Sequence, residues 1–189
     1  MSKKRIIAIA SPSGGGKTVV SKFILKTYYN VQFSISATTR EKREGEIDGV
    51  HYHFLDKETF ENKIQNNEFV EYEKIFDNYY GTLRSEIERA FKNDKCLLFD
   101  IDVKGACSIK KQYPDDTILI FLMPPSLEVL KSRLVNRKTE SIEQIEKRLS
   151  RAEMEMNIGK DFDYVVVNNV IDDTLKQISD ILNKNLLIV

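Results

Sequence analysis

The chain has 189 residues and equal numbers of acidic and basic side chains, 29 of each, so its formal net charge at pH 7 is zero. This length suits one domain with a substantial core, and a composition of 41% hydrophobic and 31% charged residues excludes disordered and fibrous proteins. A zero balance argues against a general binder of nucleic acid or membrane surfaces, so any anion site must be built from locally gathered arginine and lysine.

The cysteines and the lengths of the apolar runs indicate the cellular compartment of the protein. Cys96 and Cys107 have no Cys-x-x-Cys spacing and each lies beside an apparent core segment, so we expect two reduced thiols. The apolar run after the basic N-terminus is too short for a signal peptide, and the longest run, residues 118–123, is too short to span a bilayer. We therefore expect a cytoplasmic protein that neither enters a membrane nor binds nucleic acid.

The first predicted strand, residues 6–10, leads directly into the sequence Ser11-Pro12-Ser13-Gly14-Gly15-Gly16-Lys17-Thr18. A strand, consecutive glycines and a Lys-Thr pair opening a helix are typical of a phosphate-binding loop. The glycines let several backbone N–H groups turn toward one anion, and the helix adds its dipole. Lys17 supplies a mobile cation, and the Thr18 hydroxyl is placed to ligate Mg²⁺. The pattern predicts phosphoryl transfer from a nucleoside triphosphate.

One position of this loop departs from the usual pattern, because Ser11 replaces the first glycine. The alternative interpretation is a glycine-rich turn in which Lys17 is merely solvated. Lysine opposes the dipole at a helix N-terminus unless an anion is bound there. The position of Lys17 therefore favours the phosphate site.

The first half of the chain continues with short segments whose periodicity changes after the second strand. Residues 37–93 read as a mixed insertion of mostly short strands within a framework of alternating strands and helices. The elements predicted here are a helix over 17–28, a strand over 31–37, a polar loop over 41–49, a strand over 50–54, a short helix capped by Asp56, a strand over 69–76, and a turn at 78–82 that leads into a helix.

The second half resumes the framework with an apolar run over residues 95–102. A near-continuous apolar run suits a parallel strand covered on both faces, and its carboxylates Asp100 and Asp102 come at the end where open α/β sheets bind ligands. The elements that follow are a helix over 103–113, a strand over 117–123, a helix capped by Ser126, a helix over 142–157, a strand over 164–168 and a helix over 173–184.

Two groups of polar side chains admit more than one interpretation. His51 and His53 alternate on one strand, but no cysteine or third histidine exists to complete a metal site, so we reject that reading. Basic residues gather over 133–151, where a solvated helix face is the ordinary explanation. For Lys147 and Arg151 this explanation stays as open as a functional one.

A second site is predicted within the insertion. Two guanidinium groups three residues apart, Arg40 and Arg43, can clamp one phosphate bidentately. Tyr52 and Tyr80 can each offer a hydroxyl to that phosphate. Glu71 lies in a strand pattern, where its carboxylate can accept two parallel hydrogen bonds. Such a group suits the N1–H and N2–H edge of guanine and repels the N1 lone pair of adenine.

With these features the sequence resembles the guanylate kinases along almost its whole length. Any one motif is weak, but their order and spacing together make the resemblance strong. The motifs are residues 12–17, Ser36-Ala37-Thr38-Thr39-Arg40, Arg43 with Gly45-Glu46 and Gly49, Tyr52-His53-Phe54, Asn67-Glu68-Phe69-Val70-Glu71, Asn78-Tyr79-Tyr80-Gly81, Asp100-Ile101-Asp102 with Gly105, Pro124-Pro125-Ser126, and Arg148-Leu149.

The resemblance implies an α/β fold: a P-loop NTPase-type parallel five-stranded sheet flanked by helices, with an inserted mixed α/β GMP-binding subdomain and a helical lid. In the single domain 1–189, the core would comprise 1–36, 94–132 and 158–189, the GMP-binding subdomain 37–93 and the lid 133–157. The implied activity is Mg²⁺-dependent transfer of the γ-phosphoryl group of ATP to GMP, giving ADP and GDP in purine metabolism and GMP recycling. We expect a monomer or a small homo-oligomer.

The resemblance also assigns roles by position. Ser36, Glu71 and Asp102 would read guanine, and Asp100 would lie near GMP and the metal. Asn168 would lie near the adenine of ATP, in an Asn-Asn pair where the family commonly has Asn-Asp. Residues 11–18 would bind the ATP phosphates. The GMP phosphate would be held by Arg40, Arg43, Tyr52 and Tyr80, and Gly81 and Thr82 would also belong to the GMP site. The catalytic cations would be Lys17, Arg40, Arg43, Arg137 and Arg148.

Two alternatives remain beside this interpretation. One is an interaction module that keeps the fold and binds protein partners, although a pure binding surface has no need for the cations Lys17, Arg40, Arg43 and Arg137. The other is a P-loop kinase for a different acceptor, such as another nucleoside monophosphate. Glu71 is the residue that discriminates between acceptors.

Overall fold

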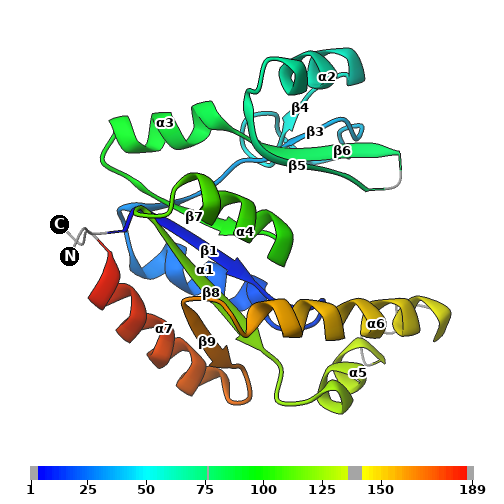
Figure 1. Ribbon diagram of the computed structural model, residues 1–189, viewed down its shortest axis with the longest axis vertical. Helices are drawn as coiled ribbons and strands as arrows, with labels where there is room; N and C mark the ends of the chain where they lie inside the picture. Colours follow the sequence, from blue (N-terminus) through cyan, green and yellow to red (C-terminus); the bar gives the residue numbers. More distant parts are fainter. Residues whose placement is uncertain (1–3, 76, 136–141, 187–189) are drawn as a thin grey trace.

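The computed structural model describes residues 4–75, 77–135 and 142–186 (Figure 1). Arg137 lies outside these ranges, so its role stays a prediction. None of the helices within them has both the length and the apolarity that crossing a bilayer requires.

A five-stranded sheet forms the centre of the molecule, as the sequence predicts. All neighbouring strands are parallel, so the carboxyl ends of the strands meet at one edge. Their order is β2 (Val31–Phe33), β7 (Cys96–Asp100), β1 (Ile6–Ala10), β8 (Thr117–Met123) and β9 (Tyr164–Val167).

Helices cover both faces of this sheet, which explains the apolar runs in its central strands. On one face, α1 (Lys17–Thr27) and α7 (Ile171–Asn185) contribute Ile24 and Ile178 to the core. The other face packs against α3 (Arg84–Lys92), α4 (Val103–Gln112) and the end of α6 (Ile142–Gly159). The remaining helix of this region, α5 (Leu127–Val135), packs against α6.

The insertion forms its own four-stranded sheet, in the order β4 (His53–Phe54), β3 (Ala37–Thr38), β6 (Asn78–Leu83) and β5 (Phe69–Ile75). It has a small core in which the rings of Phe60 and Phe69 stack with centroids 4.2 Å apart. Phe60 belongs to α2 (Lys57–Gln65), which Asp56 caps by accepting a hydrogen bond from Thr59 N. In Figure 1 this sheet and α2 form a separate layer, and α4 packs between it and the parallel sheet.

Three predicted elements were wrong in extent or type. Residues 31–37 are not one strand, because the chain leaves the parallel sheet after Phe33 and Ala37 pairs with Gly81 in the second sheet. The strand expected over 50–54 is confined to His53–Phe54. Residues 78–82 are strand rather than turn, because pairing with both β5 and β3 outweighs the turn-forming composition.

Candidate active site

The loop after β1 wraps around a cavity of about 350 Å³. Gly14 and Gly16 adopt φ values of 90° and 99°, which side chains other than glycine rarely reach. The Gly15 N–H bonds back to Pro12 O at 2.8 Å and closes the turn. The loop ends where α1 begins, so the free N–H groups of the first helical turn point toward the same region. The cavity is lined by residues 11–19 and Asp100.

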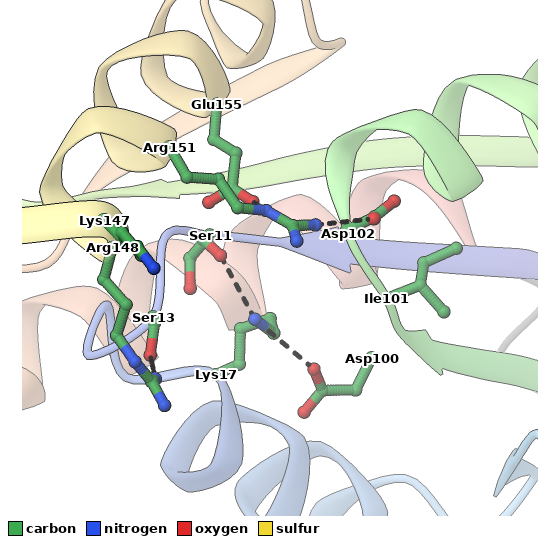
Figure 2. A pocket seen from close by; sticks show the side chains of 10 residues that line it. All are labelled: Ser11, Ser13, Lys17, Asp100, Ile101, Asp102, Lys147, Arg148, Arg151 and Glu155. Carbon is green, nitrogen blue, oxygen red and sulfur yellow. Dashed lines mark hydrogen bonds and ion pairs between the residues drawn. The ribbon is translucent and has the colours of Figure 1, made fainter. Parts of the chain in front are cut away.

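Lys17 extends from the first turn of α1 across the mouth of this loop (Figure 2). Its Nζ donates to Ser11 O at 3.1 Å and lies 3.7 Å from Asp100 Oδ1. Burial raises the pKa of the Asp100 carboxyl, and the charge and hydrogen bond of Lys17 oppose that rise. The loop therefore holds one cation and one carboxylate at its opening.

A second cavity, of about 560 Å³, separates this loop from α6 (Figure 2). From α6, the Arg148 guanidinium bonds to Ser13 Oγ on the loop. One turn further, Arg151 donates to Asp102 Oδ2 at 3.0 Å and to Glu155 Oε1 at 2.8 Å. A single helix thus reaches both the phosphate loop and the end of β7.

A third cavity, of about 570 Å³, lies between the two sheets. It brings together residues from β5, β6 and the loop before β4 with residues 100–102 at the end of β7. Residues 100–102 and Arg151 line the second cavity as well, so the two cavities adjoin there. The predicted second-site residues on its wall are Ser36, Tyr52, Glu71, Tyr80, Gly81, Asp100 and Asp102.

Glu71, Glu73 and Asp102 bring carboxylate oxygens to the wall of this third cavity. Glu71 Oε1 accepts a bond from Thr82 Oγ1 at 2.6 Å, and Asp102 Oδ1 caps α4 by accepting from Gly105 N at 2.8 Å. Burial raises the pKa of Glu71, and nearby Asp102 adds to the rise. Burial and Asp102 also raise the pKa of Glu73. The cavity can therefore receive a group rich in N–H donors.

Of the two arginines predicted to clamp a phosphate, Arg40 lies beside Tyr52. Arg40 forms a bidentate pair with Glu46, at 2.7 Å and 3.0 Å, and its guanidinium carbon lies 5.4 Å from the Tyr52 ring centroid. Arg40 and the backbone N–H of Arg43 lower the pKa of Glu46 to about 2. The Arg43 side chain is exposed. Neither arginine lines the third cavity, so only Arg40 is brought close to it, through Tyr52.

Asn168 follows β9 and is placed differently from the other predicted site residues. Its side chain is buried and donates through Nδ2 to Gly15 O at 2.7 Å, while Oδ1 accepts from Thr174 Oγ1 at 3.1 Å. It lines none of the three cavities described above. The structure therefore brings Asn168 to the back of the phosphate loop.

Sequence reasoning left Lys147 and Arg151 open and missed Glu73 and Glu155 as residues that line the cavities. Signals for Arg151, Glu155 and Glu73 were available. The spacing of Arg148, Arg151 and Glu155 puts these three on one face of a helix. Glu73 lies two residues after Glu71, and alternate residues along a strand point to the same face of a sheet.

A phosphate-binding loop that faces a separate acceptor cavity across the carboxyl ends of parallel strands defines a P-loop kinase of small molecules. Comparisons with known proteins narrow this class. A family model described as guanylate kinase matches residues 3–185. The guanylate kinase of Chlorobium luteolum is 45% identical over 92% of this chain and 88% of its own length. That of Rickettsia felis is 45% identical over 95% of this chain and 93% of its own.

Solved structures agree with these matches. The crystal structure of guanylate kinase from Anaplasma phagocytophilum has a TM-score of 0.74 at 32% identity, covering 99% of this chain and 88% of that one. A shikimate kinase from Acinetobacter baumannii, at 14% identity and a TM-score of 0.52, shares the fold alone. The chain belongs to the guanylate kinase family, and its activity is the phosphorylation of GMP by ATP.

Proposed function

We propose that the chain performs this reaction by holding ATP on the phosphate loop and GMP in the cavity between the two sheets. The observation that supports the proposal is the shared wall of the second and third cavities at residues 100–102. Two nucleotides that enter from opposite sides of this wall bring their phosphates together beside Lys17. Residues 11–18 hold the ATP phosphates through backbone N–H groups and the helix dipole.

GMP binds with its base toward the carboxylates on the wall of the third cavity. Glu71 and Asp102 accept the N1–H and N2–H donors of guanine, and Ser36 adds a hydroxyl from the same wall. Adenine presents a lone pair at N1 and is disfavoured by the same carboxylates. Tyr52, Tyr80 and Arg40 orient the GMP phosphate. Gly81 lines the same cavity, and Thr82 supports Glu71 through its hydroxyl.

The residues at the phosphate loop fit Mg²⁺ as a cofactor. Thr18 and Asp100 line one cavity and offer the hard oxygen ligands that this ion prefers. No three histidine, cysteine or acidic side chains within the described ranges gather around one point, so phosphate oxygens and water complete the coordination. When bound, Mg²⁺ neutralises charge on the ATP phosphates.

Phosphoryl transfer requires mainly that the two substrates are correctly positioned and that positive charge surrounds the transferred group. Lys17 moves with the transferred group from the donor side, and Arg40 and Arg43 orient the attacking oxygen of GMP. We assign residues 133–157 to the lid, from which Arg148 reaches the phosphates. Arg137 lies outside the described residues and keeps the role that the resemblance implies. Closure excludes water, which would otherwise accept the phosphoryl group in place of GMP. We assign residues 37–93 to the GMP-binding subdomain and the remaining residues to the core.

The cellular setting is part of the same proposal. Cys96 and Cys107 are both free thiols, which supports the cytoplasm as the compartment. We infer that the enzyme acts there as a monomer or a small homo-oligomer, with ATP and GMP as its small-molecule partners.

The proposal is tested by incubating the protein with ATP, Mg²⁺ and either GMP, AMP, CMP, UMP or no acceptor. The measured quantity is the ADP that is formed. We expect turnover with GMP and little with the other nucleotides. A preference for another monophosphate would contradict the assignment of Glu71 and Asp102. Absence of turnover with every acceptor, in a folded protein, would favour the interaction module.

A further inference from the structure

Asn168 contacts the phosphate loop from outside the cavity that the loop encloses. Its Nδ2 donates to Gly15 O at 2.7 Å, although residues 11–19 and Asp100 line the cavity and Asn168 does not. The amide is 6% exposed, so water competes little for this bond. The contact is tight as well, since a Cβ on Gly16 would collide with Nδ2.

The geometry of a trans peptide gives this contact a consequence for the anion site. The carbonyl of Gly15 and the N–H of Gly16 belong to the same planar unit and point in opposite directions. A bond that holds the Gly15 carbonyl toward Asn168 therefore turns the Gly16 N–H toward the cavity. The loop depends on such N–H groups to receive phosphate.

Several elements fix the side chain and backbone of Asn168. The Gly15 carbonyl can only accept, so the NH₂ end of the amide faces it, and Oδ1 lies 3.1 Å from Thr174 Oγ1 on α7, a hydroxyl that also lies 3.0 Å from Val170 O. The backbone N–H donates to Met123 O at 2.8 Å, and Arg133 of α5 donates to the backbone carbonyl at 2.9 Å. Asn168 is therefore held by β8, α5 and α7 together, and its side-chain amide is engaged by Gly15 and Thr174.

We propose that Asn168 is a positioning residue for the triphosphate of ATP, acting through the Gly15–Gly16 peptide rather than by contact with adenine. The inference rests on the proposed function of the loop as the ATP site. It replaces the role that the family resemblance implied for Asn168, and it predicts that substitutions affect phosphate affinity with no change in base preference.

Asn168→Asp tests this proposal because the carboxylate keeps the size of the amide but cannot donate to Gly15 O. The probes are inorganic tripolyphosphate, ATP, GTP and GMP, each titrated calorimetrically into the full chain. We expect tripolyphosphate and ATP to bind at least ~10-fold more weakly, since a buried acceptor loses its partner. The affinity for GMP should stay within ~2-fold of that of the unaltered chain, because the loss of one hydrogen bond acts locally. The ratio of ATP affinity to GTP affinity should stay the same for the same reason.

Asn169→Asp is the matched control, since it makes the same chemical change at the adjacent exposed position. It should leave tripolyphosphate affinity unchanged. Unchanged tripolyphosphate affinity in folded Asn168→Asp, or a loss of ATP-over-GTP preference without a loss of tripolyphosphate affinity, would overturn the proposal. Binding titrations do not require turnover. Failure of this proposal can therefore be told apart from failure of the proposed function, in which the unaltered chain would not phosphorylate GMP.

Thr174→Val provides a second test if Asn168→Asp does not fold. The change removes the hydroxyl that orients the amide and keeps the side-chain shape in a fully buried position. We expect tripolyphosphate to bind ~3-fold more weakly, as for the loss of one neutral hydrogen bond. Tripolyphosphate affinity equal to that of the unaltered chain would overturn the proposal by itself.

Discussion

Lys17 and Asp100 form an ion pair at the opening of the phosphate loop. Lys17 sits where a helix N-terminus disfavours a cation, and the carbonyl of Ser11 and the carboxylate of Asp100 hold it there. Asp100 in turn is partly buried, at a cost that Lys17 offsets. The two contacts therefore hold the Lys17 ammonium group at the opening of the loop, where a phosphate would bind.

Replacing Lys17 with alanine should lower kcat by at least ~10²-fold, because the mobile cation stabilises charge in the transition state. The fold should persist, since the side chain is partly exposed and contributes little to the core. Steady-state kinetics and a thermal melt provide the two measurements. Lys22→Ala, on the exposed face of the same helix, should leave kcat within ~2-fold, and near-normal turnover in Lys17→Ala would refute the role.

Replacing Glu71 with glutamine should raise KM for GMP at least ~10-fold, because a charge-assisted hydrogen bond contributes about 1.5–3 kcal/mol. The GMP-to-AMP preference should fall with it. Glu88→Gln, on the exposed side of α3, is the control. An unchanged preference in Glu71→Gln would count against the guanine assignment.

The same carboxylate predicts a pH dependence. Burial raises the pKa of Glu71, so the acceptor form is lost at a higher pH than for an ordinary glutamate as the solution is acidified. KM for GMP should therefore rise as pH falls, and Glu71→Gln should lack that step in its profile. Identical profiles for the two proteins would contradict the assignment.

At the scale of elements, α6 matters most because one of its faces reaches both nucleotide sites. Arg148 bonds to the loop residue Ser13, and Arg151 bonds to Asp102 beside the GMP cavity. Beside Arg151, the charge of Asp102 raises the pKa values of Glu71 and Glu73, in addition to the effect of burial. The charge of Arg151 on α6 opposes the rise for Glu73.

Arg151→Met should therefore raise KM for GMP by ~3- to 10-fold, and by more at pH 6 than at pH 8, because Glu73 in the same cavity protonates more readily without this charge. Arg151→Lys should recover part of the loss. Lys160→Met, which removes a charge just beyond α6, serves as the control. Equal KM values for Arg151→Met and the unaltered chain across this pH range would show that the contact has no part in GMP binding.

At the scale of the whole molecule, the second sheet has a small core of its own. The parallel sheet packs Ile9, Ile24 and Ile178 together on one face, whereas the second sheet depends on Phe60, Phe69 and Ala37. The phosphate loop depends on the parallel sheet, whereas the GMP cavity draws on both sheets, since residues 100–102 line it as well. Damage to the core of the second sheet should therefore affect the GMP site and leave the phosphate loop in place.

Phe60→Ala should weaken GMP binding strongly while tripolyphosphate still binds. The ring is fully buried and stacks on Phe69 and Tyr79, and removal of such a ring costs about 3–5 kcal/mol. Calorimetry with both ligands measures the outcome. Phe33→Ala, at a ring 44% exposed on the edge strand β2, should affect neither ligand, and parallel loss of both affinities in Phe60→Ala would show that the two parts unfold together.

The sequence by itself determined the parallel sheet, the phosphate loop and the family. These features depend on residues that are adjacent in the sequence. The strands appear as apolar runs of strand length, and the functional groups of the loop all lie within one contiguous segment. Only the tertiary structure decided that residues 78–82 form a strand and that Arg151 meets Asp102. It also decided that the buried amide of Asn168 supports the loop from behind. Each of these depends on contacts between segments far apart in the chain, and periodicity carries no information about which distant partner a side chain meets.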